Sequence, residues 1–265
     1  MGIHVEGVSK WVLRDCSFEL PSGSVTALVG ANGAGKTTLL SLLAGLLSAD
    51  SGQVRADGRV AFVAQDKPLY KHFTATDALS FGKHTNKVWD QERAVGWLSR
   101  FGVPLKRASG RLSGGQRAHI SFAVALGSRP DVLLLDEPLS ELDPLVRKEV
   151  TAALLGFVAD EGTTLVLSTH VVSELSGVAD RLLLLAQGEL LVSGEVDDLL
   201  GSHVSYVGPV STAAPGPGDV VLARHTAAQS QFLVRTPSPV SVAEPWVSRP
   251  VSLEDLVLAH LEVAE

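Results

Sequence analysis

The sequence predicts an α/β fold with a mostly parallel central sheet, and two observations support this prediction. Short apolar runs, at Val25–Val29, Val60–Ala64 and Val132–Leu135, are typical of strands buried inside a parallel sheet. Stretches with helical spacing of apolar residues lie between them, the first at Thr38–Gly45. The chain has 265 residues, which is enough for one large core with an additional small lobe.

The first strand leads into a glycine-rich loop, Gly30–Thr37, with the sequence GANGAGKT. Glycines allow successive backbone N–H groups to converge on an anion, and the helix that starts at Lys36 adds its N-terminal dipole. Lys36 is expected to reach the β- and γ-phosphates of a nucleotide, and Thr37 to hold Mg²⁺. A chance match is the alternative, but the flanking strand and helix argue against it. The predicted nucleotide-binding residues are Gly30, Asn32, Gly33, Ala34, Gly35, Lys36, Thr37 and Thr38.

Two acids, Asp136 and Glu137, follow the apolar run Val132–Leu135. Strands of this kind open onto the ligand crevice at their carboxyl ends. With a phosphate loop upstream, Asp136 is assigned to the magnesium shell and Glu137 to the attacking water. The alternative is that the two acids belong to an ordinary solvated turn that ends at Pro138.

Together with the segment Leu112–Gln116 (LSGGQ), these motifs resemble the nucleotide-binding subunit of an ATP-binding-cassette (ABC) transporter. The resemblance covers roughly Gly2–Gly201. It implies a P-loop NTPase fold with a mostly parallel sheet core, an antiparallel β subdomain and a helical signature lobe. The composition after Gly201 predicts, in addition, a small β-rich C-terminal appendix. We expect an ABC ATPase domain at residues 1–201, with the helical lobe at about 67–126. The appendix, with a terminal helix, is expected at residues 202–265.

The resemblance also implies the remaining site residues. Gln65 matches the Q-loop glutamine that touches Mg²⁺ or the attacking water, and His170 matches the switch histidine that contacts the γ-phosphate. The D-loop is matched by Ser140–Asp143, in which Asp143 is a predicted nucleotide-binding residue. The signature residues are Ser113, Gly114, Gly115 and Gln116, followed by a helix at Gln116–Leu126. In this family the signature closes over ATP bound by the opposite subunit, so ATP and Mg²⁺ are the expected cofactors.

Three positions depart from the family pattern. Trp11 stands where a tyrosine usually stacks on adenine; a tryptophan offers an equally good stacking face, and burial in the core is the alternative. Glu141 stands in the D-loop where a small residue is more common. The segment after the first helix predicts a compressed β-hairpin, with two short strands around an Asp57-Gly58 turn.

Bulk properties predict a soluble cytoplasmic protein, and the resemblance implies that it is bound to the inner face of the cell membrane through its permease partner. The longest apolar runs are far shorter than the ~20 residues that cross a bilayer, and no signal peptide begins the chain. The single cysteine, Cys16, excludes an internal disulfide framework and suits a reducing compartment. A net charge of -7 argues against nucleic acid as a partner. The eight histidines lack metal-ligand spacing, so no metal beyond Mg²⁺ is assigned.

The C-terminal segment is proline-rich, with strand-like runs at Val204–Val207, Val220–Ala223 and Gln231–Val234. The stretch Ser252–Leu261 begins SLEDL and predicts a capped amphipathic helix. This short ending resembles ATPase subunits of bacterial drug and polymer exporters, although a plain packing helix would have the same pattern.

The leading functional hypothesis is the ATPase subunit of a transporter, with export favoured over import. The expected partners are a second ABC ATPase subunit, in a homodimer or heterodimer, and separate integral membrane permease subunits. Tyr70 and Phe73, in the loop Lys67–Thr74, are expected to face the permease; alternatively, Leu69 and Phe73 cap the helical lobe. The competing hypotheses are an importer ATPase, an ABC ATPase acting on nucleic acid or in translation, and a regulatory subunit without turnover.

Overall fold

A six-stranded sheet forms the centre of the protein, which we describe from a computed structural model of residues 2–172, 177–237 and 242–264. The strand order is β5-β6-β7-β3-β8-β9. All neighbouring pairs are parallel except β8 and β9, which form a hairpin around Gln187-Gly188. The strands are β3 (Val25–Val29), β5 (Val60–Val63), β6 (Val132–Leu135), β7 (Thr164–Thr169), β8 (Arg181–Ala186) and β9 (Glu189–Glu195).

Parallel pairing brings the carboxyl ends of three strands to one edge of the sheet. β3, β7 and β6 are neighbours, with Val29 opposite Thr169 and Leu135 opposite Leu167. All residues of these three strands are buried, as expected for strands covered on both faces. The loops that follow them therefore start close together in space, although they are far apart in the sequence.

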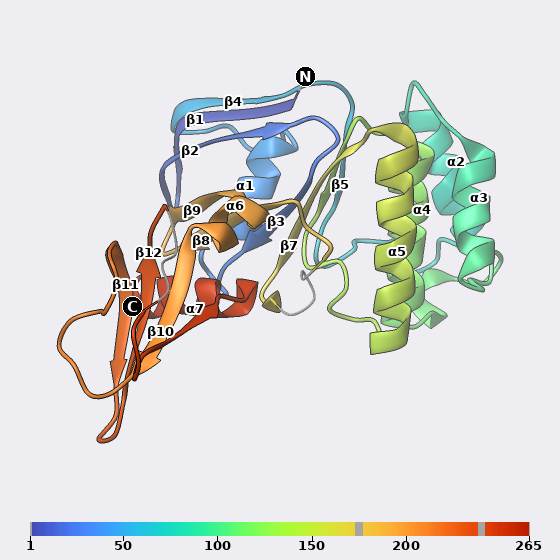
Figure 1. Ribbon diagram of the computed structural model, residues 1–265. Helices are drawn as coiled ribbons and strands as arrows, with labels where there is room; N and C mark the ends of the chain where they lie inside the picture. Colours follow the sequence, from blue (N-terminus) through green and yellow to red (C-terminus); the bar gives the residue numbers. More distant parts are fainter. Residues whose placement is uncertain (1, 173–176, 238–241, 265) are drawn as a thin grey trace.

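A three-stranded antiparallel sheet covers one face of the central sheet, with α1 (Lys36–Leu43) between the two layers (Figure 1). Its order is β2-β1-β4, with β1 (Gly2–Lys10), β2 (Leu13–Pro21) and β4 (Ser51–Ala56). Leu39, Leu40, Leu42 and Leu43 of α1 are buried between the layers. Each leucine buried in this way contributes about 1.5–3 kcal/mol.

The predicted hairpin after the first helix is wrong, although both strands exist. β4 pairs with β1 in the antiparallel sheet, whereas β5 pairs with β6 in the central sheet. The Asp57-Gly58 segment is therefore a crossing between two sheets. Arg59 explains the crossing: its backbone N–H donates to the Asp131 carboxylate at 2.7 Å, and its carbonyl accepts from Asp131 N and Val132 N. These bonds hold the chain to the start of β6 as soon as it leaves Gly58.

Helices cover the other face and form a lobe at one end of the molecule (Figure 1). Side-chain caps fix three of their starts: Thr74 with Asp77 on α2, Asp90 on α3, and Ser113 with Gln116 on α4. α5 starts with Pro144 in its first turn and ends at Gly162, whose φ of 65° suits glycine. The elements are α2 (Ala75–Thr85), α3 (Gln91–Arg100), the 3₁₀ turn Ser109–Arg111, α4 (Gly114–Gly127) and α5 (Pro144–Glu161).

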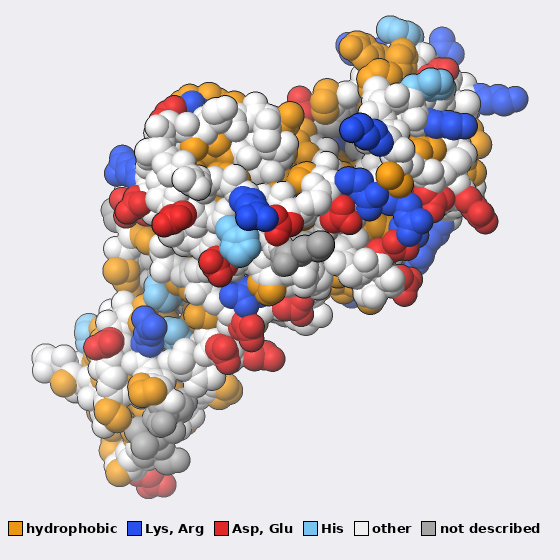
Figure 2. Space-filling view, turned by 90° about the horizontal axis from the view of Figure 1, so that it is seen from above, with side chains coloured by type: hydrophobic (Ala, Val, Ile, Leu, Met, Phe, Trp, Pro, Cys, Tyr) orange, Lys and Arg blue, Asp and Glu red, His pale blue; other side chains and the backbone are white. Residues whose placement is uncertain are grey.

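The C-terminal segment forms a small antiparallel sheet at the opposite end, so that the molecule is elongated in both views (Figures 1 and 2). Its order is β11-β12-β10-β13. The three strands expected from the sequence are present, and β13 is an additional one. The elements are α6 (Val196–Gly201), β10 (His203–Gly208), β11 (Asp219–His225), β12 (Ser230–Arg235), β13 (Val247–Pro250) and α7 (Leu253–Ala264). The predicted fold class is thus confirmed. Met1 and Glu265, the outer limits of the two predicted domains, lie outside the described residues.

Candidate nucleotide site

The glycine-rich loop joins β3 to α1, and its glycines have identifiable steric roles. A Cβ at Gly30 would lie 2.3 Å from the carbonyl oxygen of Leu185 on β8, so only glycine allows this approach. Gly33 and Gly35 have φ values of 83° and 110°, which other residues rarely adopt. The loop therefore depends on glycine both for its close approach to β8 and for its turn into α1.

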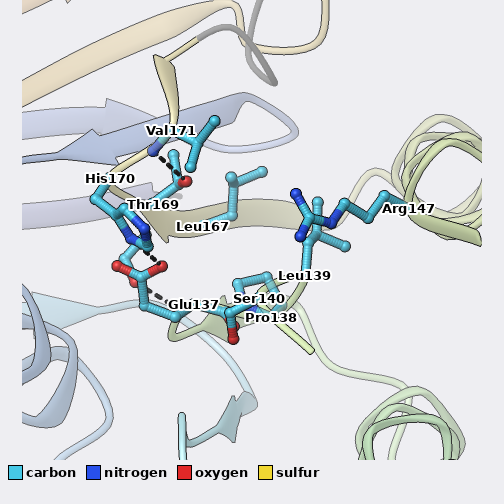
Figure 3. Close-up of a pocket in the computed structure, with 10 residues that line it drawn as sticks. Glu137, Pro138, Leu139, Ser140, Arg147, Leu167, Thr169, His170 and Val171 are labelled. Carbon is cyan, nitrogen blue, oxygen red and sulfur yellow. Dashed lines mark hydrogen bonds and ion pairs between the residues drawn. The ribbon is translucent and has the colours of Figure 1, made fainter. Parts of the chain in front are cut away.

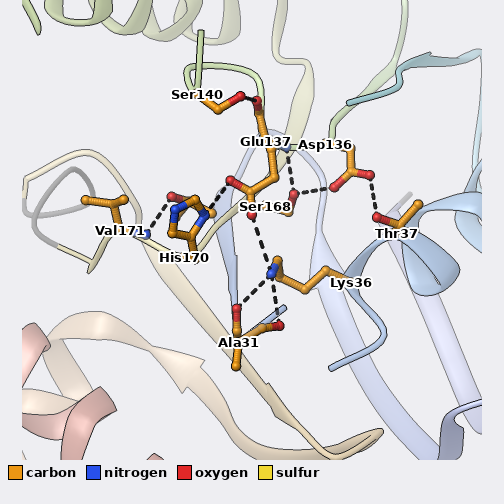
Figure 4. A network of polar contacts seen from close by, with 11 residues as sticks. Ala31, Lys36, Thr37, Asp136, Glu137, Ser140, Ser168, His170 and Val171 are labelled. Carbon is orange, nitrogen blue, oxygen red and sulfur yellow. Dashed lines mark hydrogen bonds and ion pairs between the residues drawn. The ribbon is translucent and has the colours of Figure 1, made fainter. Parts of the chain in front are cut away.

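Lys36, the first residue of α1, is only 6% exposed and crosses the inside of the loop. Its Nζ donates to the carbonyl oxygens of Gly30 at 2.7 Å and Ala31 at 3.2 Å. The same Nζ lies 3.4 Å from Oε1 of Glu137 (Figure 4). The lysine thus stands between the phosphate loop and the acid at the end of β6.

Asp136 is fully buried and held by hydroxyl groups from two other elements. Thr37 Oγ1 donates to one carboxylate oxygen at 2.6 Å, and Ser168 Oγ donates to the other at 2.6 Å (Figure 4). Ser168 also accepts a hydrogen bond from the backbone N–H of Glu137 at 2.9 Å. Both oxygens of Asp136 are therefore fixed, and one of them lies next to the Thr37 hydroxyl.

Glu137 takes a left-handed backbone conformation, with φ of 46°. For a residue other than glycine this conformation costs about 1–3 kcal/mol, and residues held in it are concentrated at functional sites. Its Oε2 lies 2.9 Å from Nδ1 of His170, and its carbonyl accepts from Ser140 Oγ. A cavity of about 80 Å³ adjoins the Glu137–His170 pair (Figure 3). The strained backbone directs the carboxylate toward Lys36 and His170 together.

These groups line a cavity of about 380 Å³ in front of the loop. Gln65, two residues after the end of β5, also lines this cavity. The lining residues are Val12, Asn32, Gly33, Gly35, Lys36, Thr37, Thr38, Gln65, Asp136 and Glu137. Trp11 is 71% exposed beside Val12, which excludes its burial in the core. Gly30 and Ala34 form the back of the loop.

The donor set suits Mg²⁺. A threonine hydroxyl, a carboxylate and a glutamine amide are oxygen ligands of the kind that this cation prefers. Thr37 and Asp136 already lie in contact, and Gln65 lines the same cavity. These three residues would hold the ion, with water and phosphate oxygens completing its shell.

The remaining predicted residues do not line this cavity. Ser113 and Gln116 form a capping box on α4, in which Ser113 Oγ accepts from Gln116 N and Gln116 Oε1 accepts from Ser113 N, both at 3.2 Å. The helix thus begins at Gly114, two residues earlier than predicted. Asp143 is exposed at the start of α5. The structure brings the phosphate loop, Gln65, Asp136, Glu137 and His170 together, and leaves Asp143 and the signature at a separate surface.

Sequence reasoning missed Ser168, which holds both Asp136 and the Glu137 backbone. The sequence contains only an indirect indication of this role for Ser168. Leu135 is opposite Leu167 in the parallel pair β6–β7, so the next residues, Asp136 and Ser168, must be adjacent. A polar residue near the end of a buried strand that neighbours the acid-bearing strand could have identified it.

An apolar groove of about 510 Å³ lies apart from the nucleotide cavity, between β5, the segment that follows it, α2 and α4. Tyr70 is 68% exposed there, whereas Leu69 and Phe73 are half-buried. The segment is pinned by Ser109, whose Oγ donates to the Tyr70 carbonyl and whose N–H donates to the Phe73 carbonyl. The main lining side chains are Phe62, Leu69, Tyr70, Phe73, Phe81 and Val124.

The fold and the site together define a P-loop nucleotide-binding protein, and comparisons with known proteins narrow this class. A family model described as "ABC transporter" matches residues 13–140. The ABC transporter ATP-binding protein MJ1023 of Methanocaldococcus jannaschii, which is uncharacterized, is 31% identical over 207 residues, covering 74% of this chain and 79% of that protein. The chain belongs to the family of ABC transporter ATP-binding proteins.

Two further similarities are informative. The sulfate/thiosulfate import ATP-binding protein CysA of Yersinia pseudotuberculosis is 34% identical over 224 residues, or 75% of this chain. The match spans only 62% of the length of CysA. A solved structure described as the ATP-binding subunit of an ABC transporter superposes with a TM-score of 0.69 at 24% identity, covering 75% of this chain and 92% of that one. This last similarity concerns the fold alone.

The exporter-type resemblance is not supported by these relatives, because the one with a stated direction of transport is an import protein. The structure adds no support for it. Ser252 and Asp255 of the SLEDL ending cap α7, with Ser252 Oγ donating to Asp255 at 2.6 Å and accepting from Asp255 N at 3.1 Å. Leu253, Leu256 and Val257 are buried. α7 is therefore a helix that packs against the rest of the protein, which is the alternative that the sequence also allowed.

Proposed function

We propose that the chain is the ATP-hydrolysing subunit of an ABC transporter, acting with a second cassette and with membrane permease subunits. The observation that carries the proposal is the position of the Glu137 carboxylate. It lies between Lys36 of the phosphate loop and His170 at the end of β7, at the edge of a cavity sized for a nucleotide. This arrangement joins phosphate binding to a general base.

The residues divide the work of hydrolysis. Glu137 accepts a proton from the attacking water, and His170 orients that carboxylate from its other side. Lys36 neutralises the β- and γ-phosphates, aided by the N–H groups of the loop. Thr37, Asp136 and Gln65 hold Mg²⁺, which supplies charge neutralisation at the phosphate oxygens.

The signature acts in trans. Ser113 and Gly114 stand at the N-terminus of α4, an anion-binding end of a helix, yet they do not line the cavity of their own chain. A second cassette facing the first would place this helix end against the γ-phosphate. ATP then holds two subunits together, and hydrolysis releases them. Asp143, exposed near the signature, contacts the partner cassette, and Trp11 stacks on the adenine.

The apolar groove is the proposed contact with the permease. Exposed aromatic side chains are common at interfaces, and Tyr70 projects at the edge of the groove only a few residues after Gln65. Among the described residues, every helix is too short or too polar to span a bilayer. In the proposed transporter, permease subunits cross the membrane and the cassette acts at its cytoplasmic face.

The direction of transport is proposed as import, because CysA is an import protein and neither of the relatives described above is named as an exporter. Nucleic acid is not a proposed partner, since the net charge is -7. Reconstitution of the copurified complex in vesicles of both orientations tests the direction. Export of the cargo that copurifies, rather than uptake, would contradict it.

Glu137→Gln tests the proposed function. The amide keeps the shape of the carboxylate but cannot accept the proton, so ATP turnover should fall by about 10²–10⁴-fold while ATP binding persists. The variant should accumulate as an ATP-bound dimer in size-exclusion chromatography. The control is Glu149→Gln, an exposed acid on α5. Retention of more than about a tenth of wild-type turnover would exclude Glu137 as the base.

A further inference from the structure

Lys67 is a buried cation that the hydrolysis reaction does not use. It is 3% exposed, and its backbone is left-handed, with φ of 44°. Its Nζ donates to the carbonyl of Gln65 at 3.1 Å and lies 3.8 Å from Oε1 of Glu141. Because a buried charge is costly unless it is paired, these contacts indicate its role. The lysine joins the Q-loop to the D-loop.

The Glu141 carboxylate lies against the first turn of α4. A Cβ at Gly114 would be 2.2 Å from Oε2 of Glu141, and a Cβ at Gly115 would be 3.1 Å from the Leu142 side chain. The two signature glycines therefore permit the D-loop to pack directly onto the signature. As a result, a carboxylate lies at the helix end proposed to receive the γ-phosphate of the partner's ATP. Two anions at one helix end repel each other unless one is neutralised.

We propose that Lys67 is the counter-ion that makes the acidic D-loop compatible with phosphate docking at the signature. This inference rests on the proposed function, because it assumes that the signature binds nucleotide in trans. Lys67 neutralises Glu141, so the N-terminus of α4 keeps its attraction for the partner's phosphate. Lys67 is a positioning residue that acts through Glu141 and touches no nucleotide of its own chain.

The location of Lys67 gives the ion pair a second consequence. Lys67 also lines the apolar groove, beside Leu69 and Tyr70. An occupant of the groove that displaces the lysine would expose the Glu141 charge to the docking phosphate. The Lys67–Glu141 ion pair, which joins the Q-loop to the D-loop, thus couples the groove to the ATP-bound contact between the two cassettes.

The test measures the MgATP concentration that gives half-maximal dimerisation, by light scattering. The parent is the Glu137→Gln chain, which cannot consume the nucleotide. Lys67→Met should raise this concentration by roughly tenfold, because Glu141 is left without its partner. Lys67→Arg should behave like the parent. Adding Glu141→Gln to Lys67→Met should return the half-maximal MgATP concentration to within about twofold of the parent's, since no unpaired charge remains.

Three outcomes overturn the proposal: parent-like dimerisation of Lys67→Met, no rescue by Glu141→Gln, or a defect that does not shrink at high ionic strength. Rescue is the readout that a merely structural role would not produce. If Lys67→Met fails to fold, Lys67→Gln takes its place with the same expected values, because it keeps a donor for the Gln65 carbonyl. Failure of the Glu137→Gln parent to dimerise with MgATP would instead contradict the proposed function. Binding of MgADP to the monomer should be equal in all variants.

Discussion

His119 shows how a single buried residue couples stability to pH. It is 4% exposed, stacks on Phe101 with ring centroids 4.2 Å apart, and its Nδ1 has no hydrogen-bond partner among the described residues. Burial lowers the pKa of His119 from 6.5 to about 4. The unfolded chain therefore binds a proton more readily than the native protein does. As a result, the free energy of unfolding keeps its full value above pH 6.5 and falls as the pH drops toward 4.

We expect the free energy of unfolding to fall by about 2 kcal/mol between pH 8 and pH 5 on account of His119 alone. His119→Leu removes the titrating group and keeps an apolar side chain in the core of the lobe. The pH-dependent loss measured by urea unfolding should therefore be smaller in the variant by about that amount. Other histidines contribute equally to both proteins and cancel in the comparison. Equal losses would show that His119 is not protonated on unfolding in this range.

Trp11 is an exposed aromatic residue next to the nucleotide cavity in the sequence, and its proposed role is to stack on the adenine. Its side chain is largely exposed, and the next residue, Val12, lines the cavity. Trp11→Ala should weaken binding of ATP and GTP alike by about 1 kcal/mol, because stacking tolerates any base. KM should rise with little change in kcat, and Trp11→Tyr should restore it. An unchanged KM for both nucleotides would place Trp11 outside the binding surface.

At the scale of elements, the separation between the phosphate loop and α4 predicts complementation between subunits. Ser113→Arg places a bulky cation where the partner's phosphate docks, while Lys36→Ala disables the loop. A heterodimer of the two variants has one site that lost both elements and one that kept both. Each homodimer should be inactive, and the mixture should regain measurable ATPase activity.

This experiment needs a control for folding, because Ser113 also caps α4, and loss of a cap costs about 1 kcal/mol. The Ser113→Arg chain should still bind MgADP through its own phosphate loop. A mixture without activity, from subunits that pass this control, would contradict two sites that act independently.

The strands and helices of the cassette that the sequence predicted each depend on a local pattern. The phosphate loop, Asp136, Glu137 and His170 were placed correctly relative to strand ends, since parallel pairing gathers those ends at one edge. Pairing partners were harder to predict. The Asp57-Gly58 turn has the composition of a hairpin turn, but the bonds between Arg59 and Asp131 hold the chain at the start of β6, so that β5 pairs in the other sheet.

Contacts between loops were missed for a related reason. The Lys67–Glu141 pair joins segments that follow different strands, and neither residue belongs to a motif with a recognised charge partner. Such a pair requires knowledge of how the two loops fold back on the sheet. The same holds for Ser168, whose role depends on the register between β6 and β7.

At the scale of the whole molecule, the helical lobe and the C-terminal sheet lie at opposite ends, with the nucleotide cavity in the body between them (Figure 1). Basic side chains gather over the lobe end, whereas acidic side chains are spread along the molecule (Figure 2). The apolar groove lies where the lobe joins the central sheet, between α4 and β5. A permease bound in the groove, as proposed above, would contact residues on both sides of Gln65, among them Ala64 and Lys67.

The groove provides the last prediction, which concerns coupling to the membrane. Tyr70 and Phe73 contact each other, with ring centroids 5.1 Å apart, at its edge. Tyr70→Ala/Phe73→Ala should leave folding and basal ATPase activity close to wild type, because neither ring contacts the nucleotide cavity. The same change should abolish copurification with the permease or transport, since it removes the exposed aromatic surface. The control is Val210→Ala, an exposed apolar residue in the C-terminal part. Unfolding of the double variant would assign the rings to the core of the lobe, and full transport by a stably folded variant would place the permease contact elsewhere.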